Sequence, residues 1–209
     1  AAAVVVLDLT VVRMEPDGST SQYTHQATKL LSAEAKDDIA NVGTPGEVVL
    51  LRTLSADGSV LEPVPATGQE AYVMPGVNPG AIVEHAHRTD RSARHGRPLR
   101  LPRFFFMDPT YQHSFLLSRY VVLLPREAPA DVVETALNDK RSGSSDWDFP
   151  NVTKTVRDLE DGGQALIYEA RNVPRIQRER LQPSPAEYVP NVEVISKRSW
   201  TDLANELVV

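Results

Sequence analysis

Residues 4–31 read VVVLDLTVVRMEPDGSTSQYTHQATKLL, and this stretch decides the fold class. Apolar and polar residues alternate from Val6 to Val12, with the period of two that is typical of a β-strand. Pro16-Asp17-Gly18-Ser19 then supplies a turn, because Pro fixes φ in advance and Gly accepts a positive φ without steric cost. A second strand over Thr20–Leu30 is therefore predicted to pair with the first in a β-hairpin.

Residues that favour turns recur at short intervals in the rest of the chain. Asp57-Gly58-Ser59 repeats the first turn, Met74–Gly80 is rich in Pro and Gly, and Gly162-Gly163 marks a tight hairpin. Between these turns we predict strands over Val48–Leu54, Val60–Glu62, Ala81–His87, Phe104–Met107, Phe115–Leu124, Val152–Leu159, Gln164–Ala170 and Val192–Ser196. The stretch Phe115–Leu124 is apolar enough to predict a strand that is buried on both faces. About nine or ten strands in all predict an all-β fold, a β-sandwich in which a second sheet covers the apolar faces.

The remaining segments predict little regular structure. One short helix is expected over Ala33–Ile39, with Ser32 as its N-cap. Small and polar residues predict a flexible excursion over Asp139–Pro150. Prolines around Gln182–Pro185 argue against continued sheet or helix there. A capped helix is expected to start at Ser199.

Composition excludes several classes of function. The chain has 209 residues, 28 acidic against 22 Lys plus Arg, and a formal net charge of −6, which argues against a nucleic-acid partner. No stretch approaches the length of a membrane span, so membrane insertion is not expected. With no cysteine, the chain has no disulfide, no thiolate metal ligand and no cysteine nucleophile.

Arginines are concentrated between Arg88 and Arg103, at positions 88, 91, 94, 97, 100 and 103. Gly96 and two prolines among them argue for an exposed loop. Such a loop suits an anionic ligand or a protein partner, although it also suits a solvated loop whose arginines pair with the surplus carboxylates. Trp147, in the polar excursion, could contact a glycan or a protein if it is exposed, although packing back over the sheet is the commoner fate of such a residue. The candidate partner or ligand surface consists of Arg91, Arg94, Arg97, Arg100 and Trp147.

His85 and His87 form the sharpest local pattern for chemistry. Residues i and i+2 of a strand point to one face, so both imidazoles could reach one metal ion, with Glu84, His95 or His113 as a third ligand. The spacing is common and no third ligand is fixed by the sequence, so the polar face of a sheet or the edge of a loop explains the pair better than a metal site does. We therefore predict no metal site and no cofactor.

Other catalytic or ligand-binding patterns are weaker still. No Gly-x-Ser-x-Gly elbow presents a serine nucleophile. Asp146 and Asp148 lack the spacing of a Ca²⁺ loop, and Gly162-Gly163 lacks the lysine of a phosphate-binding loop. No catalytic residue is predicted.

The order of motifs resembles a bacterial domain family of unknown function that lies immediately before transglutaminase-like domains. The resemblance covers roughly residues 4–197, and its most specific piece is Pro79–Glu84. The motifs that carry it are Asp17-Gly18-Ser19, Asp57-Gly58-Ser59-Val60, Pro75–Glu84, Tyr168–Ile176, the segment 172–179, the Pro-Ser-Pro tail at 183–185 and Ser199–Ala204.

The resemblance implies an immunoglobulin-like β-sandwich over residues 1–197, with 198–209 as the truncated start of a transglutaminase-like domain. It implies a non-catalytic accessory module that packs against that neighbouring domain or presents substrate to it, and it favours an extracytoplasmic or cell-envelope location. The oligomeric state stays open. One alternative is a carbohydrate- or peptide-binding sandwich that uses Trp147 or the Arg88–Arg103 loop. Another is a hydrolase assisted by a metal at His85 and His87.

Overall fold

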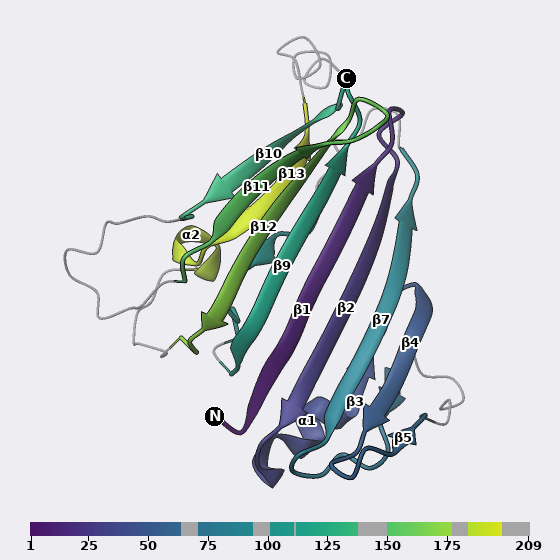
Figure 1. Ribbon diagram of the computed structural model, residues 1–209, viewed down its shortest axis with the longest axis vertical. Helices are drawn as coiled ribbons and strands as arrows, with labels where there is room; N and C mark the ends of the chain where they lie inside the picture. The colour runs from purple at the N-terminus through teal and green to yellow at the C-terminus, as the bar shows by residue number, and fades with distance from the viewer. Residues whose placement is uncertain (64–70, 94–100, 111, 138–149, 177–183, 198–209) are drawn as a thin grey trace, which may run out of the picture.

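The computed structural model in Figure 1 describes residues 1–63, 71–93, 101–110, 112–137, 150–176 and 184–197. Strands dominate these residues, which confirms the all-β prediction. The elements are β1 (Ala3–Met14), β2 (Thr20–Leu30), the 3₁₀ turn η1 (Ala33–Ala35), α1 (Lys36–Ala40), β3 (Asn41–Gly43), β4 (Glu47–Leu54), β5 (Val60–Leu61), β6 (Ala71–Val73), β7 (Ile82–Arg91), β8 (Phe104–Phe105), β9 (Ser114–Leu124), β10 (Ala130–Thr135), β11 (Thr153–Asp158), β12 (Gln164–Val173), α2 (Pro185–Tyr188) and β13 (Asn191–Ser196).

One large twisted sheet runs through the molecule, with the strand order β11-β12-β9-β1-β2-β7-β4-β5. The β1–β2 hairpin is paired from Ala3 and Leu30 up to Met14 and Thr20, as the turn at Pro16–Ser19 predicted. On its other side β1 pairs with β9 in parallel, whereas the remaining pairs in this sheet are antiparallel. The parallel pair joins the two halves of the sheet at its centre (Figure 1).

Two separate layers cover one face of this sheet, which we call the inner face. The three-stranded sheet β10-β13-β8 covers the half made by β12, β9 and β1, around a core that includes Tyr120, Tyr168 and Phe106. The segment from η1 to β3, together with β6, covers the far end around Leu30 and Ile39. The two hydrophobic clusters share no residue. The middle of the inner face lies between them.

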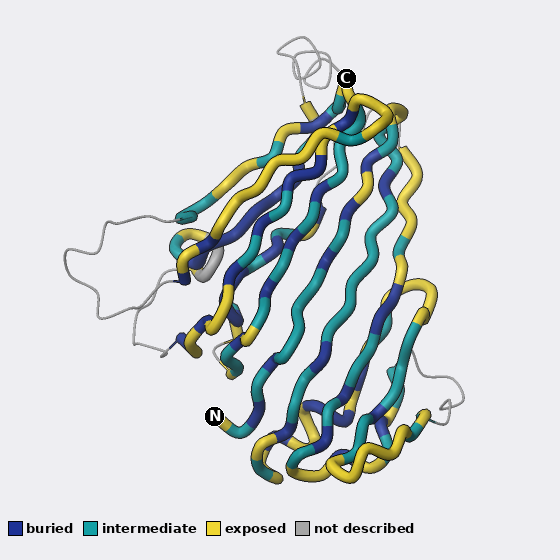
Figure 2. Tube along the Cα trace, in the orientation of Figure 1, coloured by how far each residue is buried: buried dark blue, intermediate teal, exposed yellow. Residues whose placement is uncertain are grey.

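The opposite face of the large sheet, the outer face, carries no second layer in the described part of the chain. In Figure 1 no other described helix or strand lies in front of β12, β9, β1 and β2. Along β1, β2 and β9, residues of intermediate burial outnumber buried ones, and few are exposed (Figure 2).

Several details differ from the predictions. Thirteen strands are present in the described residues, against the nine or ten expected. Strand β9 alternates between buried and partly exposed positions, because only its inner face meets the covering sheet. Ser32 precedes η1 but makes no capping hydrogen bond. Pro185 does not exclude a helix. It occupies the first position of α2, where the missing N–H costs nothing.

The arginine-rich stretch was predicted to be a loop, but its first part belongs to a strand. Arg88 and Arg91 lie in strand β7, paired opposite Tyr23 and Thr20 of β2. Near the other end, Arg103 donates from Nε to Oε2 of Glu193 at 3.0 Å. Residues 94–100 lie outside the described residues, as do the predicted excursion around Trp147 and the predicted helix from Ser199.

Candidate functional site

A β-bulge in β1 sets the direction of the side chains at the centre of the sheet. The register with β2 shifts at Val6, which has no partner on that strand. Beyond the bulge Asp8 and Thr10 point to the inner face, while Leu9 and Val11 point outward. Bulges re-aim side chains in this way and are over-represented next to functional sites. The centre of the sheet is therefore polar on its inner face and apolar on its outer face, the reverse of an ordinary half-buried sheet.

Two polar rows cross the inner face at right angles to the strands. The first row is Ser118 on β9, Asp8 on β1, Gln26 on β2 and His85 on β7, each directly opposite the next. Within it the Ser118 hydroxyl donates to Asp8 at 3.1 Å, and Nε2 of His85 lies 3.2 Å from Oε1 of Gln26.

The second row runs next to the first, through Tyr120, Thr10, Thr24 and His87. The Thr10 and Thr24 hydroxyls lie 3.4 Å apart, and the ring of Tyr120 stacks on Phe104 with centroids 4.8 Å apart. Three buried atoms of these rows, Nδ1 of His85, Nδ1 of His87 and the Tyr120 hydroxyl, have no hydrogen-bond partner in the described structure. Such unpaired groups are costly in a protein interior.

Asp8 is the one carboxyl group in the first row. Burial has the largest effect on its pKa, the Ser118 hydrogen bond opposes it only partly, and the charge of Asp108 adds to it, so the pKa of Asp8 is raised to about 7. Carboxyl groups with pKa values shifted this far are concentrated at functional sites.

Asp108 lies near Asp8, but its surroundings shift its pKa in the opposite direction. Its Oδ1 accepts from the Thr110 amide at 2.8 Å and the Thr110 hydroxyl at 2.6 Å, and its Oδ2 from the amides of Gln112 and His113 at 3.0 and 2.7 Å. Nδ1 of His113 lies 3.1 Å from the same Oδ2. Burial opposes ionisation, but these hydrogen bonds outweigh it and hold the pKa of Asp108 well below its usual range. The loop thus presents a fixed anion.

Asp8, Thr10, Gln26 and His85 of these rows help to line two adjoining cavities between the covering layers, of about 260 and 270 Å³. We call them together the inner groove. Val5, Gln26 and His113 line both. The remaining lining residues are Asp8, Thr10, Arg103, Phe104, Phe105, Asp108, Pro109 and Phe115 in the first, and Thr28, Asp38, Ile39, Asn41, Val42, Gly43, Val83 and His85 in the second.

His85 and His87 do share a face, as their spacing predicted, and their rings stack with centroids 6.2 Å apart. Burial lowers the pKa of both imidazoles, that of His85 to about 4 with a further contribution from His87 and His25. Glu84 points to the outer face and cannot be the third ligand. Among the residues that the structure describes, no group of three or more His, Asp or Glu is arranged to hold a metal ion.

The outer face carries a contiguous apolar patch over the three central strands. We define the outer patch as Leu9 and Val11 of β1, Val121 and Leu123 of β9, and Ile167 of β12. Val11, Val121 and Ile167 are direct neighbours across the strands. None of the five belongs to either hydrophobic core. Apolar patches of this kind on a sheet mark interaction surfaces.

Ion pairs flank the outer patch on both sides. On one side Arg119 pairs with Glu169, which also accepts from Nε of Arg171 at 2.6 Å. These hydrogen bonds, that from Arg119 first, lower the pKa of Glu169.

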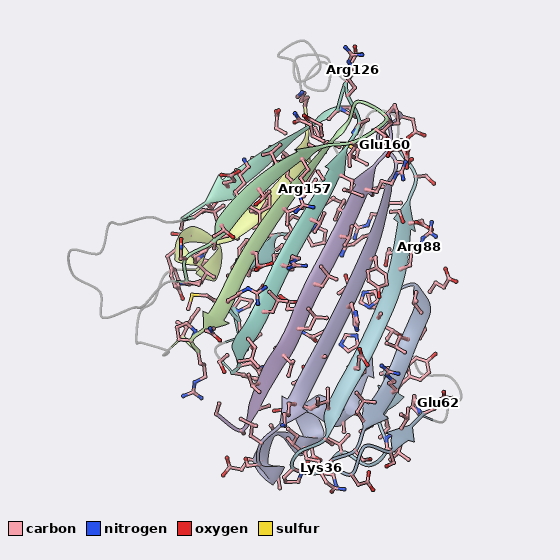
Figure 3. The ribbon with its side chains drawn as sticks, viewed as in Figure 1. Lys36, Glu62, Arg88, Arg126, Arg157 and Glu160 are labelled. Carbon is pink, nitrogen blue, oxygen red and sulfur yellow. The ribbon has the colours of Figure 1, made fainter. Side chains whose placement is uncertain are left out.

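On the other side Glu84 accepts from Nε of Arg52 at 2.7 Å and lies 2.8 Å from Nε2 of His25. Burial opposes ionisation of Glu84, but the hydrogen bonds from Arg52 and His25 outweigh it and lower its pKa. Farther out, Arg88 on β7 and Arg157 on β11 lie at the margins of this face (Figure 3). An apolar centre with a charged rim is the usual anatomy of a protein interface.

Of the candidate surface residues that the sequence suggested, only Arg91 lies among the described residues. Arg91 is exposed at the end of β7, where it is paired with Thr20 of β2. Arg94, Arg97, Arg100 and Trp147 lie outside the described residues, as do His95 and the pair Asp146 and Asp148. Neither the inner groove nor the outer patch was predicted from the sequence.

Comparisons with known proteins support the fold. No protein-family model matches the chain, and no curated protein matches it in sequence. Among solved structures, it is similar to the crystal structure of a protein from Parabacteroides distasonis that is described as a putative protease. The TM-score is 0.73 at 14% identity, and the similarity covers 96% of this chain and 41% of that one. The chain therefore spans less than half the length of that larger protein.

The described helices are short, and none has the length and apolar character needed to cross a bilayer.

Proposed function

We propose that this chain is a non-catalytic β-rich module that packs, through its outer patch, against a neighbouring catalytic domain of the same polypeptide. The neighbour implied by the sequence resemblance is a transglutaminase-like domain. In this role the module stabilises the catalytic domain or presents substrate to it.

The observation that carries this proposal is the outer patch. Five aliphatic side chains on three adjacent strands lie outside both cores, whereas the solvated face of an antiparallel sheet is normally polar. Rim charges around such a patch fit an interface between domains. The share of the Parabacteroides protein that this chain covers, 41%, is consistent with one module of a longer protein.

Co-expression of this chain with the remainder of its parent polypeptide, as two separate fragments, tests the proposal. We expect a stable complex by analytical ultracentrifugation, and at least a tenfold loss of affinity on Val121→Glu, because the new carboxylate would be desolvated at the centre of the interface.

Val156→Glu is the matched control. Val156 is 50% exposed on β11 and lies on the inner side of the sheet, so its substitution should leave the affinity unchanged. Fragments that neither associate nor stabilise each other, or equal effects of the two substitutions on affinity, would contradict the proposal.

The finer fold proposal is an immunoglobulin-like sandwich. It is supported by the way the sheet β10-β13-β8 faces the strands β12, β9 and β1 of the large sheet, with Tyr120 and Phe104 stacked between them. The two sheets are also tied at their edge, where the Tyr168 hydroxyl donates to Glu134 at 2.8 Å. The alternative of a carbohydrate- or peptide-binding sandwich based on Trp147 or on the Arg88–Arg103 loop stays a prediction.

A further inference from the structure

We propose that the inner groove is a binding site for an alkylammonium group, such as a lysine side chain of a peptide or a small diamine. Its ammonium would lie against Asp8 and its methylene groups against the apolar wall. The site is separate from the outer patch, on the opposite face of the same strands.

The position of Asp8 is the first support. Asp8 has one hydrogen-bond donor in the described structure, the neutral hydroxyl of Ser118. A carboxylate can accept about four hydrogen bonds, so most of its capacity is unused. A buried carboxylate with so little compensation gains strongly from a cationic donor, because the pair shares the cost of desolvation. The raised pKa of Asp8 reflects the same lack of compensation.

The charges around the groove favour a cation. Three carboxyl groups line it, Asp8 on β1, Asp38 on α1 and Asp108 on the loop before β9. Among the described residues that line the groove, Arg103 is the one arginine, and it already donates to Glu193. Asp108 is held ionised by its own loop, whose five hydrogen bonds leave it with little need of a ligand. It acts as a fixed negative charge near Asp8.

The remaining wall fits an aliphatic stem rather than a bare ion. Val5 lines both cavities, with Phe104 and Phe115 in the first and Ile39 and Val83 in the second. Aromatic side chains near a cation add a further attraction. Unpaired Nδ1 of His85 offers an acceptor or donor for a second polar group of the ligand.

Titration of the ¹⁵N-labelled chain with butylammonium, followed by NMR at pH 8, tests the site. The matched probes 1-butanol and butyrate have the same stem with no charge or the opposite charge. We expect saturable shifts at the amides of Asp8 and Gln26 with butylammonium alone. A lysine-containing peptide and 1,5-diaminopentane, compared next, distinguish the two sources of the group.

Two substitutions that should leave the chain folded test whether butylammonium binds at Asp8. Asp8→Asn should weaken butylammonium at least tenfold. Gln26→Glu, directly opposite Asp8 on β2, should strengthen it severalfold by adding a second carboxylate. Asp131→Asn, at an exposed position on β10, is the control and should change nothing. Equal binding of butanol or butyrate, or an affinity within twofold of wild type for Asp8→Asn, would overturn the proposal. Because the isolated chain is used, neither result depends on the docking of a neighbouring domain.

Discussion

Asp8 couples the stability of the fold to pH. Burial raises its pKa in the folded state to about 7 from 3.8, so the folded chain holds a proton that the unfolded chain has lost between these values. The free energy of unfolding therefore falls as the pH rises from about 4 to about 7, and then levels off.

Asp8→Asn should remove this dependence. We expect the variant to be more stable than wild type by about 1–3 kcal/mol at pH 8 and nearly equal to it at pH 4, since Asn keeps an acceptor for Ser118 and carries no charge. Urea denaturation at the two pH values measures the difference. A wild-type stability that rises between pH 4 and pH 7, with Asp8→Asn following it in parallel, would show that Asp8 is not the group responsible.

Asp108 makes the free energy of unfolding depend on pH in the opposite direction. Its pKa is depressed in the folded state, so its contribution is present above about pH 4 and is lost as the pH falls below that value. Asp108→Asn should cost about 2–3 kcal/mol at pH 7, because the amide nitrogen cannot accept from Gln112 and His113.

Asp17→Asn provides the matched control for Asp108. Asp17 also accepts from a residue two positions ahead, Ser19, but in an exposed hairpin turn. Its substitution should have a much smaller effect in the same thermal or urea unfolding experiment. Equal losses for the two variants would mean that the loop bonds of Asp108 add nothing beyond an ordinary turn.

At the level of elements, β4 depends on a glycine at its entry. Gly46 has φ of +90°, and a Cβ there would lie 2.3 Å from the carbonyl oxygen of Arg88 on β7. Gly58 has a similar φ of +87° but open space around it. The two residues therefore separate backbone strain from steric collision.

Gly58→Ala should cost about 1–2 kcal/mol, the price of a left-handed residue with a side chain. Gly46→Ala should cost clearly more, about 3 kcal/mol or above, because β4 must also move away from β7. The shift in urea midpoint compares them directly. If the two substitutions cost the same, the close approach of Arg88 is not a constraint on the fold.

The positions of the strands were largely predictable from the sequence. Which side chains point to the inner face of the sheet and which to the outer face was not. The turn at Pro16–Ser19 and the alternation on either side specified the β1–β2 hairpin correctly. The alternation does not say where a bulge falls, and a shift of one residue exchanges the two faces of a strand. The bulge at Val6 is a tertiary feature, so the inward turn of Asp8 and the outward turn of Leu9 could not be read from the sequence.

At the level of the whole molecule, the groove joins residues that are far apart in the chain. Asp8, Gln26, His85 and Asp108 meet because β1 lies between β9 and β2, and β2 pairs with β7. The parallel pairing of β1 with β9 spans about a hundred residues and leaves no local signal. The one available hint was the run of polar residues on alternate positions of β2, from Gln22 to Thr28.

The central claim is that the outer patch is covered by a neighbouring domain, and single-cysteine labelling tests it most directly. The chain has no cysteine of its own, so Val121→Cys introduces a unique thiol on the patch and Val156→Cys one on the opposite side of the sheet. Maleimide labelling of each, measured by mass spectrometry of the modified peptide, is compared between the isolated chain and the full parent polypeptide. Strong protection of residue 121 in the parent, with residue 156 labelled equally in both, is the predicted result. Equal labelling of residue 121 in the isolated chain and in the parent would contradict the claim.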